Sequence, residues 1–150
     1  MTDISGIKLF KNLKEISLFD NNLTDISVLK YLTNLEYLYI SENILKDISV
    51  LKNLNNLKSL YLHNNEINDI LVLKYLIKLK ELYLHYNKIK DISVLKDLTE
   101  LESLDISYLE LKSDQFKYIL SLNNLKTLWC KKAFKDMSVL NQLNNTKIFK

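Results

Sequence analysis

Apolar residues recur along this chain with two different spacings. In the stretch YLYI at residues 37–40, Leu38 and Ile40 alternate with tyrosines, which is the period of a strand with one buried face. A few residues later, Ile48, Leu51 and Leu54 lie three apart, which is the spacing of a helical turn. The pattern therefore predicts a short strand followed by a short helical segment.

This switch of period repeats at intervals of 22 residues. DISVLK occurs at 25–30, 47–52 and 91–96, with the near copies DILVLK at 69–74 and DMSVLN at 136–141. The predicted units are 13–34, 35–56, 57–78, 79–100, 101–124 and 125–145, with partial units at 1–12 and 146–150. One strand and one helical turn cannot bury their own leucines, so stacked units must share a core. We expect residues 1–150 to form a single domain.

Each unit begins with the pattern Leu-x-x-Leu-x-Leu/Ile-x-x-Asn-x-Leu/Ile. This pattern resembles the leucine-rich repeat, and the DIS that follows it is most similar to the 22-residue subtype of bacterial internalins and phosphatase-regulating Sds22-like proteins. The resemblance implies an α/β leucine-rich-repeat solenoid, with a curved parallel β-sheet on the concave face and short helical or 3-10 segments on the convex face. It also implies a protein partner, either on a host cell surface or an intracellular phosphatase.

Two polar residue types recur at fixed places in the units. Asparagine follows the strand at positions 21, 43, 65 and 87, where its amide can bond to backbone groups that lose sheet partners, so an internal asparagine ladder is predicted. The ladder should stop after Asn87, because Leu109 takes the next position. Aspartates at 25, 47, 69, 91 and 136 precede the helical segments and are expected to cap them. With one glycine and no proline, asparagine is also expected to form the turns.

The segment KSDQFKYILSL at 112–122 departs from the regular unit. It predicts one or two helical turns, with Ser113 or Asp114 as the cap. Phe116, Ile119 and Leu120 are expected on one side of these turns.

The composition excludes several classes of protein. The net charge of +3 is too small to indicate nucleic acid or a membrane as the partner. The single cysteine, Cys130, excludes an internal disulfide and is expected to be buried and inert. No apolar run is long enough to span a bilayer, and the N-terminus lacks the pattern of a signal peptide. A cytoplasmic protein is expected, with secretion by a signal-free route or a fragment of a surface protein as alternatives.

The outward positions of the predicted strands bring aromatic side chains together. Successive units place Ser17, Tyr39, Tyr61, Tyr83, Asp105 and Trp129 in one row, and Phe19, Ser41, His63, His85, Ser107 and Lys131 in the next. Tyrosine and tryptophan supply large, rigid contact areas with a polar tip. The candidate partner-binding residues are Phe19, Tyr37, Tyr39, Tyr61, His63, Tyr83, His85, Tyr86, Asp105, Tyr108, Trp129 and Lys131.

The same face is predicted to be electrically polarised, with Glu15, Asp20 and Glu42 near one end and Lys131 and Lys132 near the other. We predict a monomeric, non-enzymatic module that binds another protein through this tyrosine-rich concave face. No cofactor, metal, nucleic acid or membrane partner is expected.

Several alternatives stay open at this point. The aromatic face could bind carbohydrate, the chain could be a structural scaffold or a fragment of a larger repeat protein, or the tyrosines could simply cover one another on an exposed sheet. His63, His85 and Asp105 could share a metal, and a stripe of lysines at 8, 30, 52, 74 and 96 could follow phosphates, but solvation explains both more simply. No serine is marked as an activated nucleophile.

Overall fold

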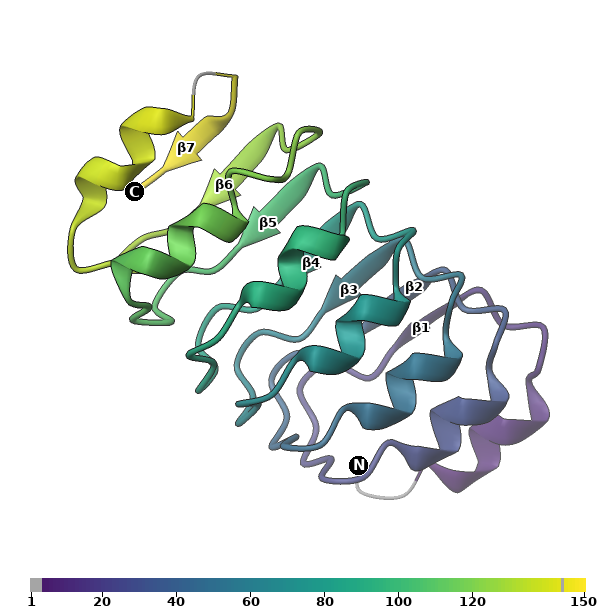
Figure 1. Ribbon diagram of the computed structural model, residues 1–150. Coiled ribbons are helices and arrows are strands. Elements are labelled where there is room, and N and C mark those ends of the chain that lie inside the picture. Colours follow the sequence, from purple (N-terminus) through teal and green to yellow (C-terminus); the bar gives the residue numbers. More distant parts are fainter. Residues whose placement is uncertain (1–3, 144) are drawn as a thin grey trace.

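The strands form one parallel sheet in which every strand pairs with the next one along the chain. The computed structural model describes residues 4–143 and 145–150. The seven strands, in order across the sheet, are β1 (Glu15–Ser17), β2 (Tyr37–Tyr39), β3 (Ser59–Tyr61), β4 (Glu81–Tyr83), β5 (Ser103–Asp105), β6 (Thr127–Trp129) and β7 (Lys147–Phe149). Sequence order therefore runs steadily along the solenoid (Figure 1).

A row of short 3-10 helices lies on the opposite side from the sheet (Figure 1). They are η1 (Ser5–Leu9), η2 (Ser27–Tyr31), η3 (Ser49–Asn53), η4 (Leu71–Tyr75), η5 (Ser93–Asp97), η6 (Ser113–Tyr118) and η7 (Met137–Gln142). This alternation confirms the predicted solenoid with strands on one face and 3-10 segments on the other. Across residues 4–143 and 145–150, every helix is too short to cross a membrane.

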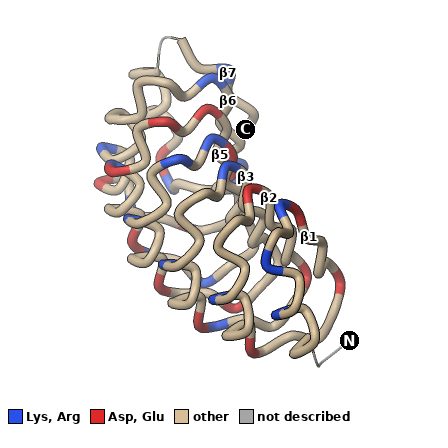
Figure 2. The backbone as a smooth tube through the Cα atoms, turned by 90° about the vertical axis from the view of Figure 1, so that its right-hand side faces the viewer, with Lys and Arg blue, Asp and Glu red and all other residues tan. Residues whose placement is uncertain are grey.

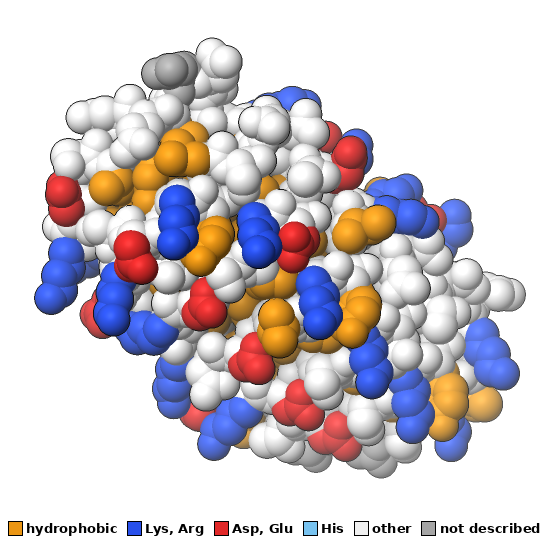
Figure 3. Space-filling view, viewed as in Figure 1, with side chains coloured by type: hydrophobic (Ala, Val, Ile, Leu, Met, Phe, Trp, Pro, Cys, Tyr) orange, Lys and Arg blue, Asp and Glu red, His pale blue; other side chains and the backbone are white. Residues whose placement is uncertain are grey.

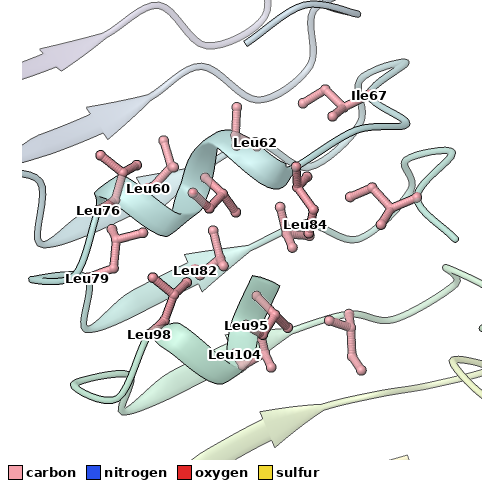
Figure 4. Close-up of a cluster of buried hydrophobic side chains, with 14 of the residues drawn as sticks. Leu60, Leu62, Ile67, Leu76, Leu79, Leu82, Leu84, Leu95, Leu98 and Leu104 are labelled. Atoms are coloured by element: carbon pink, nitrogen blue, oxygen red, sulfur yellow. The ribbon is translucent and has the colours of Figure 1, made fainter. Parts of the chain in front are cut away.

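The core is a stack of leucine and isoleucine layers between the sheet and the helices. In the unit at 57–78, the buried residues are Leu57, Leu60, Leu62, Ile67, Ile70, Leu73 and Leu76, all with 2% exposure or less. Figure 4 shows Leu60 and Leu62 in the space between the strands and the helices, with Leu82 and Leu84 of the following unit in equivalent places. Burial of such layers supplies the stability that a single unit lacks.

The predicted asparagine ladder is present. Asn65 donates from Nδ2 to the carbonyl oxygens of Ile40 (3.1 Å) and Leu62 (3.0 Å), and its Oδ1 accepts from the backbone N–H of Leu45 (3.0 Å). Asn43 and Asn87 make the equivalent bonds one unit earlier and one unit later. Each amide therefore ties together two neighbouring units at the bend, where the backbone has left the sheet.

The aspartates accept backbone N–H groups at the helix starts, as the sequence predicted. Four of them stand one position before the N-cap, whereas Asp136 is itself the N-cap of η7. Oδ1 of Asp47 accepts a 2.7 Å hydrogen bond from the N–H of Ser49, and this bond, together with the Ser49 hydroxyl, lowers the pKa of Asp47. Asp25, Asp69, Asp91 and Asp136 bond the backbone in the same way. In η2 to η5 the N-cap itself is an isoleucine, as Ile48 is for η3, and the aspartate lies just before it.

The turns are made by asparagine only in part. Turns that precede strands contain Asn12, Asn34, Asn55, Asn56, Asn123 and Asn124, as predicted. The left-handed backbone conformation falls on Asp20, Glu42, Asn64, Tyr86, Tyr108, Glu110 and Lys132, with φ between 52° and 60°. Asparagine occupies this place only at Asn64, and the ladder asparagines follow it by one residue. The prediction that asparagine forms the turns was therefore wrong for the left-handed position, where residues of other types adopt this costly conformation.

The irregular segment near residue 112 differs from its prediction in two details. Helix η6 begins after Lys112, which makes no side-chain cap, so neither Ser113 nor Asp114 occupies the cap position. Phe116 and Ile119 are buried as predicted, but Leu120 is 39% exposed. The helix ends at Tyr118, and the chain turns before Leu120 reaches the core.

Acidic and basic residues occur along the whole length of the solenoid (Figure 2). Glu36, for example, lies between two lysines of neighbouring units, with Lys14 Nζ at 3.1 Å and Lys58 Nζ at 2.6 Å. Such exposed pairs keep neighbouring units in register but contribute little to stability.

Candidate functional site

Aromatic side chains form a continuous row on the outer face of the sheet. Parallel, in-register pairing places Tyr39 beside Tyr61 and Tyr61 beside Tyr83. The first two rings have centroids 4.8 Å apart, and the next two are stacked at 4.3 Å with an interplanar angle of 18°. Tyr83 contacts Trp129 at 5.8 Å, and Trp129 stacks on Phe149 at 5.3 Å. We call these five residues, Tyr39, Tyr61, Tyr83, Trp129 and Phe149, the aromatic ridge.

The tyrosines of the ridge are partly removed from water. Burial is the main cause that raises the pKa of Tyr61 and of Tyr83 above that of free tyrosine. Glu81 lies beside them, and one of its carboxylate oxygens accepts hydrogen bonds from Ser59 Oγ (2.9 Å) and from the Tyr61 hydroxyl (3.3 Å). These phenols are therefore neutral hydrogen-bonding groups at neutral pH, and Glu81 holds the orientation of the Tyr61 hydroxyl.

In β5 the aromatic row contains an aspartate, Asp105, which lies between Tyr83 and Trp129 in the sheet. The rings of Tyr83 and Trp129 contact each other across this position. The Asp105 side chain turns to the neighbouring row, where Oδ2 lies 2.9 Å from Nδ1 of His85 and Oδ1 accepts from the Ser107 N–H at 2.9 Å. Burial raises the pKa of Asp105, but the contacts with His85 and Ser107 outweigh burial and lower it overall. The carboxylate is therefore ionised and engaged with its neighbours.

Two imidazole rings lie next to the ridge. His63 and His85 stack with centroids 4.3 Å apart and an interplanar angle of 10°, and the His63 ring meets Tyr61 edge-on at 6.4 Å. Burial, followed by the proximity of His85, lowers the pKa of His63 to about 4, although Asp105 acts in the opposite direction. His63 is therefore uncharged at neutral pH and behaves as a flat, weakly polar part of the surface.

A second tyrosine pair borders the imidazoles. Tyr86 and Tyr108 stack at 4.4 Å with an interplanar angle of 13°, and Lys132 Nζ lies 5.8 Å from the centroid of the Tyr108 ring. A hydrogen bond with Tyr86 and the nearby Lys131 and Lys132 lower the pKa of Tyr108. Cationic side chains thus border this end of the face, whereas the exposed acids Glu15, Asp20 and Glu42 belong to the first two units.

Comparisons with known proteins agree with this architecture. A family model described as Leucine Rich repeats (2 copies) matches residues 11–53 and 33–75. An internalin from Listeria monocytogenes is 32% identical with a TM-score of 0.81, and internalin C2 from the same organism is 34% identical with a TM-score of 0.86; each match covers 99% of this chain. The chain is a leucine-rich repeat protein. Its repeats are of the internalin type.

This leucine-rich repeat protein corresponds to only part of each internalin. It spans 50% and 65% of the length of the two internalins. The Arabidopsis receptor kinase HAESA, in complex with the peptide hormone IDA and the co-receptor SERK1, is 24% identical over 86% of this chain and 23% of that chain, with a TM-score of 0.74, and shows the shared fold alone. No curated protein matches the sequence. Leucine-rich repeat folds are typical of protein–protein interaction modules, and such proteins are generally not enzymes.

The structure brings most of the predicted site residues of this leucine-rich repeat protein together. Tyr39, Tyr61, Tyr83 and Trp129 lie in the ridge, and His63, His85, Tyr86, Asp105 and Tyr108 form the neighbouring contacts. Phe19 and Lys131 are exposed beside this group, and Tyr37 is half-buried in β2. In the described part of the chain, neither Phe19 nor Tyr37 pairs with another aromatic ring.

Two serines of the predicted outward row are not available to a partner. Ser41 is 2% exposed and Ser107 is 7% exposed, whereas we expected both to point out over the sheet. Ser107 uses its Oγ to accept a hydrogen bond from the backbone N–H of Lys131 at 3.1 Å. A side chain this short is covered by the larger side chains of its row, so alternation alone overestimates its exposure.

Phe149 and Glu81 are site residues that the sequence analysis missed. Ile148 occupies the place of the inward strand leucine and pairs with Leu128, which puts Phe149 beside Trp129 at the end of the ridge. The place of Phe149 in the row could have been predicted from the spacing of the final partial unit. Glu81 stands opposite Ser59 in the adjacent strand, and only the orientation of its side chain reveals the bond to Tyr61.

The face offers little that would support catalysis. Among residues 4–143 and 145–150, no group of three or more His, Cys, Asp or Glu side chains is arranged to hold a metal ion. Cys130 is fully buried, and burial raises the pKa of its thiol to about 11, so it stays protonated.

Proposed function

We propose that this leucine-rich repeat protein binds a folded protein partner through the aromatic ridge and the side chains beside it, without any chemistry on the partner. The continuous contact of the five rings, two pairs of which are stacked and two tilted, carries this proposal. Aromatic side chains dominate the energetics of protein interfaces. Because each ring is held by its neighbours before a partner arrives, binding costs little additional side-chain entropy.

The charges on the face support an oriented partner. Glu15, Asp20 and Glu42 are exposed in the first two units, and Lys131 and Lys132 are exposed at the other end. A partner with the reverse arrangement of charges would be steered into one orientation, and its association would slow as salt is added. HAESA, which shares the fold, is itself in complex with a peptide hormone and a co-receptor.

The geometry favours protein over carbohydrate as the ligand. A sugar stacks on the open face of an aromatic ring, but the faces of Tyr61 and Tyr83 are turned toward each other at 4.3 Å, and Trp129 is stacked on Phe149. Within these two pairs, the stacked faces are closed to a sugar, and the ring edges and tyrosine hydroxyls are left to contact a partner. Ring edges carry the positive end of the aromatic quadrupole and suit the carbonyl and carboxylate oxygens of a protein surface.

An affinity pull-down with mass spectrometry tests the proposal. A Tyr39→Ala/Tyr61→Ala/Tyr83→Ala variant, shown to be folded by circular dichroism, is expected to lose a partner that the wild type captures. Tyr31→Ala is the matched control, since Tyr31 is an exposed tyrosine of η2 on the helical side. A partner that the triple variant retains would contradict the proposal, as would a glycan array on which the wild type binds sugars and the triple variant does not.

A further inference from the structure

Two of the described 3-10 helices do not begin with serine: η7 begins with Met137, which Ser138 follows, and η4 begins with a leucine. Helices η1, η2, η3, η5 and η6 begin with serine, whereas η4 begins with Leu71. This leucine is 56% exposed, so it contributes little to the core, which in the same helix is served by the fully buried Leu73. The repeats thus provide an internal control in which a large apolar side chain replaces serine at one exposed place.

Neither folding nor helix capping accounts for the leucine. In η2, Ser27 donates both its N–H and its hydroxyl to Asp25, at 2.7 Å and 3.2 Å. In η4 the N–H of Leu71 still donates to Asp69 Oδ1 at 2.8 Å, so the cap persists without the hydroxyl. Leu71 shares the lining of a groove with the exposed Tyr75, and contiguous exposed apolar side chains mark an interaction surface.

Leu71 forms one wall of a groove between η3 and η4. The groove has a volume of about 270 Å³ and is also lined by Ile48, Val72 and Tyr75. Tyr75 is 50% exposed, and Lys74 Nζ lies 5.1 Å from the centroid of its ring. On the helical side of the molecule, apolar side chains are visible between lysines (Figure 3).

The charges around the groove are unevenly compensated. Its aspartates, Asp47 and Asp69, each accept a backbone N–H from the first residue of a 3-10 helix, which offsets part of their charge. Of its lysines, Lys46 lies 3.6 Å from Glu66, but Lys52 and Lys74 form no ion pair within the part of the chain that the structure describes. Because three lysines line the groove against two aspartates, the lining carries a net charge of +1, and an occupant that brings carboxylates complements it better than a basic one.

We propose that the groove between η3 and η4 is a second docking site, which takes an acidic peptide segment of another protein with one apolar side chain between its carboxylates. The apolar side chain lies against Leu71, Val72 and Tyr75, and the carboxylates lie near Lys52 and Lys74. This site is on the helical side and is independent of the aromatic ridge. One adaptor could therefore hold two partners at once.

Selection from a random peptide library displayed on phage tests the proposal. Peptides that bind the wild-type protein are counter-selected on a Leu71→Ser variant, which restores the serine with which η3 and η5 begin. Survivors are expected to carry Asp or Glu next to Leu, Ile, Phe or Trp. By fluorescence polarisation, Leu71→Ser should weaken their binding roughly tenfold, the worth of one apolar contact, and added salt should weaken it further.

Two control variants separate this site from other surfaces. Ile77→Thr removes an equally exposed apolar side chain of the same unit that does not line the groove, and it should leave binding unchanged. Tyr61→Ala/Tyr83→Ala should also leave it unchanged, so failure of the ridge as a binding face would not affect this result. The proposal is overturned if no peptide depends on Leu71, or if the survivors are basic. It is equally overturned if sedimentation shows a wild-type dimer that Leu71→Ser dissociates, since a second copy would then be the occupant.

Discussion

The two parts of this solenoid satisfy the backbone hydrogen-bonding groups at the bend in different ways. In the units at 13–100, strands begin 22 residues apart, and an amide such as that of Asn65 serves the backbone groups at the bend. In residues 101–150 the last two intervals between strand starts are 24 and 20 residues, and the apolar Leu109 takes the equivalent place with 1% exposure. Leucine has no polar atom with which to continue the ladder.

Backbone pairing and ring packing replace the amides in the C-terminal part. Leu111 forms an isolated parallel bridge with Phe134, and its N–H donates to the carbonyl oxygen of Ala133 at 2.6 Å. The rings of Phe116 and Phe134 pack edge-to-face at 5.7 Å. The comparison shows that the bend needs satisfied backbone groups rather than asparagine itself, and that irregular unit length accompanies the apolar solution.

The largest expected effect on stability comes from placing leucine, as at Leu109, in the asparagine position of a regular unit. Asn65→Leu removes the donors to Ile40 and Leu62 and the acceptor of Leu45 while leaving these backbone groups buried. We expect the free energy of unfolding to fall by about 3 kcal/mol, measured by urea denaturation. Asn68→Leu, at an exposed position, should change it by less than about 0.5 kcal/mol. A loss below about 1 kcal/mol for Asn65→Leu would show that the ladder is dispensable.

The imidazole pair lies where the two parts meet, because His63 and His85 belong to regular units and Asp105 to the first irregular one. The pKa of His63 is lowered to about 4 in the folded protein, and the unfolded chain takes up the proton near the ordinary value of about 6.5. As the pH falls through this interval, protons bind the unfolded state first, so stability is lost.

This loss is measurable in urea denaturation curves between about pH 7 and about pH 5, above the range in which most carboxylates titrate. We expect the wild type to lose roughly 1 kcal/mol more than His63→Gln over this interval, after allowance for solvent screening. At about pH 8.5, well above the unfolded pKa, the two proteins should respond equally to a small change of pH. Equal losses over the whole interval would mean that His63 is not held in its neutral form by the fold.

A smaller, stabilising effect is expected at the left-handed turn. Glu42 has φ of 55°, and the equivalent position one unit later is Asn64, with φ of 53°. Asparagine tolerates this conformation better than glutamate does, so Glu42→Asn should raise the free energy of unfolding by about 0.5 kcal/mol. Glu100→Asn, at an exposed turn residue outside the left-handed set, serves as the control and should give no gain in thermal denaturation.

Much of the fold could be predicted because the same local pattern is written several times. The strand positions of Leu38 and Leu60, the caps at Asp25 and Asp47, and the end of the ladder after Asn87 all follow from residue type and spacing. In a parallel sheet built from equal units, equal positions must lie side by side. The membership of the aromatic row followed for the same reason, except for Phe149 in the final partial unit.

The sequence by itself determined which side chains share a row, since register follows from unit length. Only the tertiary structure decided how those side chains meet: that the ridge passes over Asp105, that Ser41 is covered, and that Glu81 reaches the Tyr61 hydroxyl. These outcomes depend on side-chain length and rotamer across strands that are 20 or more residues apart. Spacing along the chain carries no information about them, because two side chains compete for the same volume only after the units have stacked.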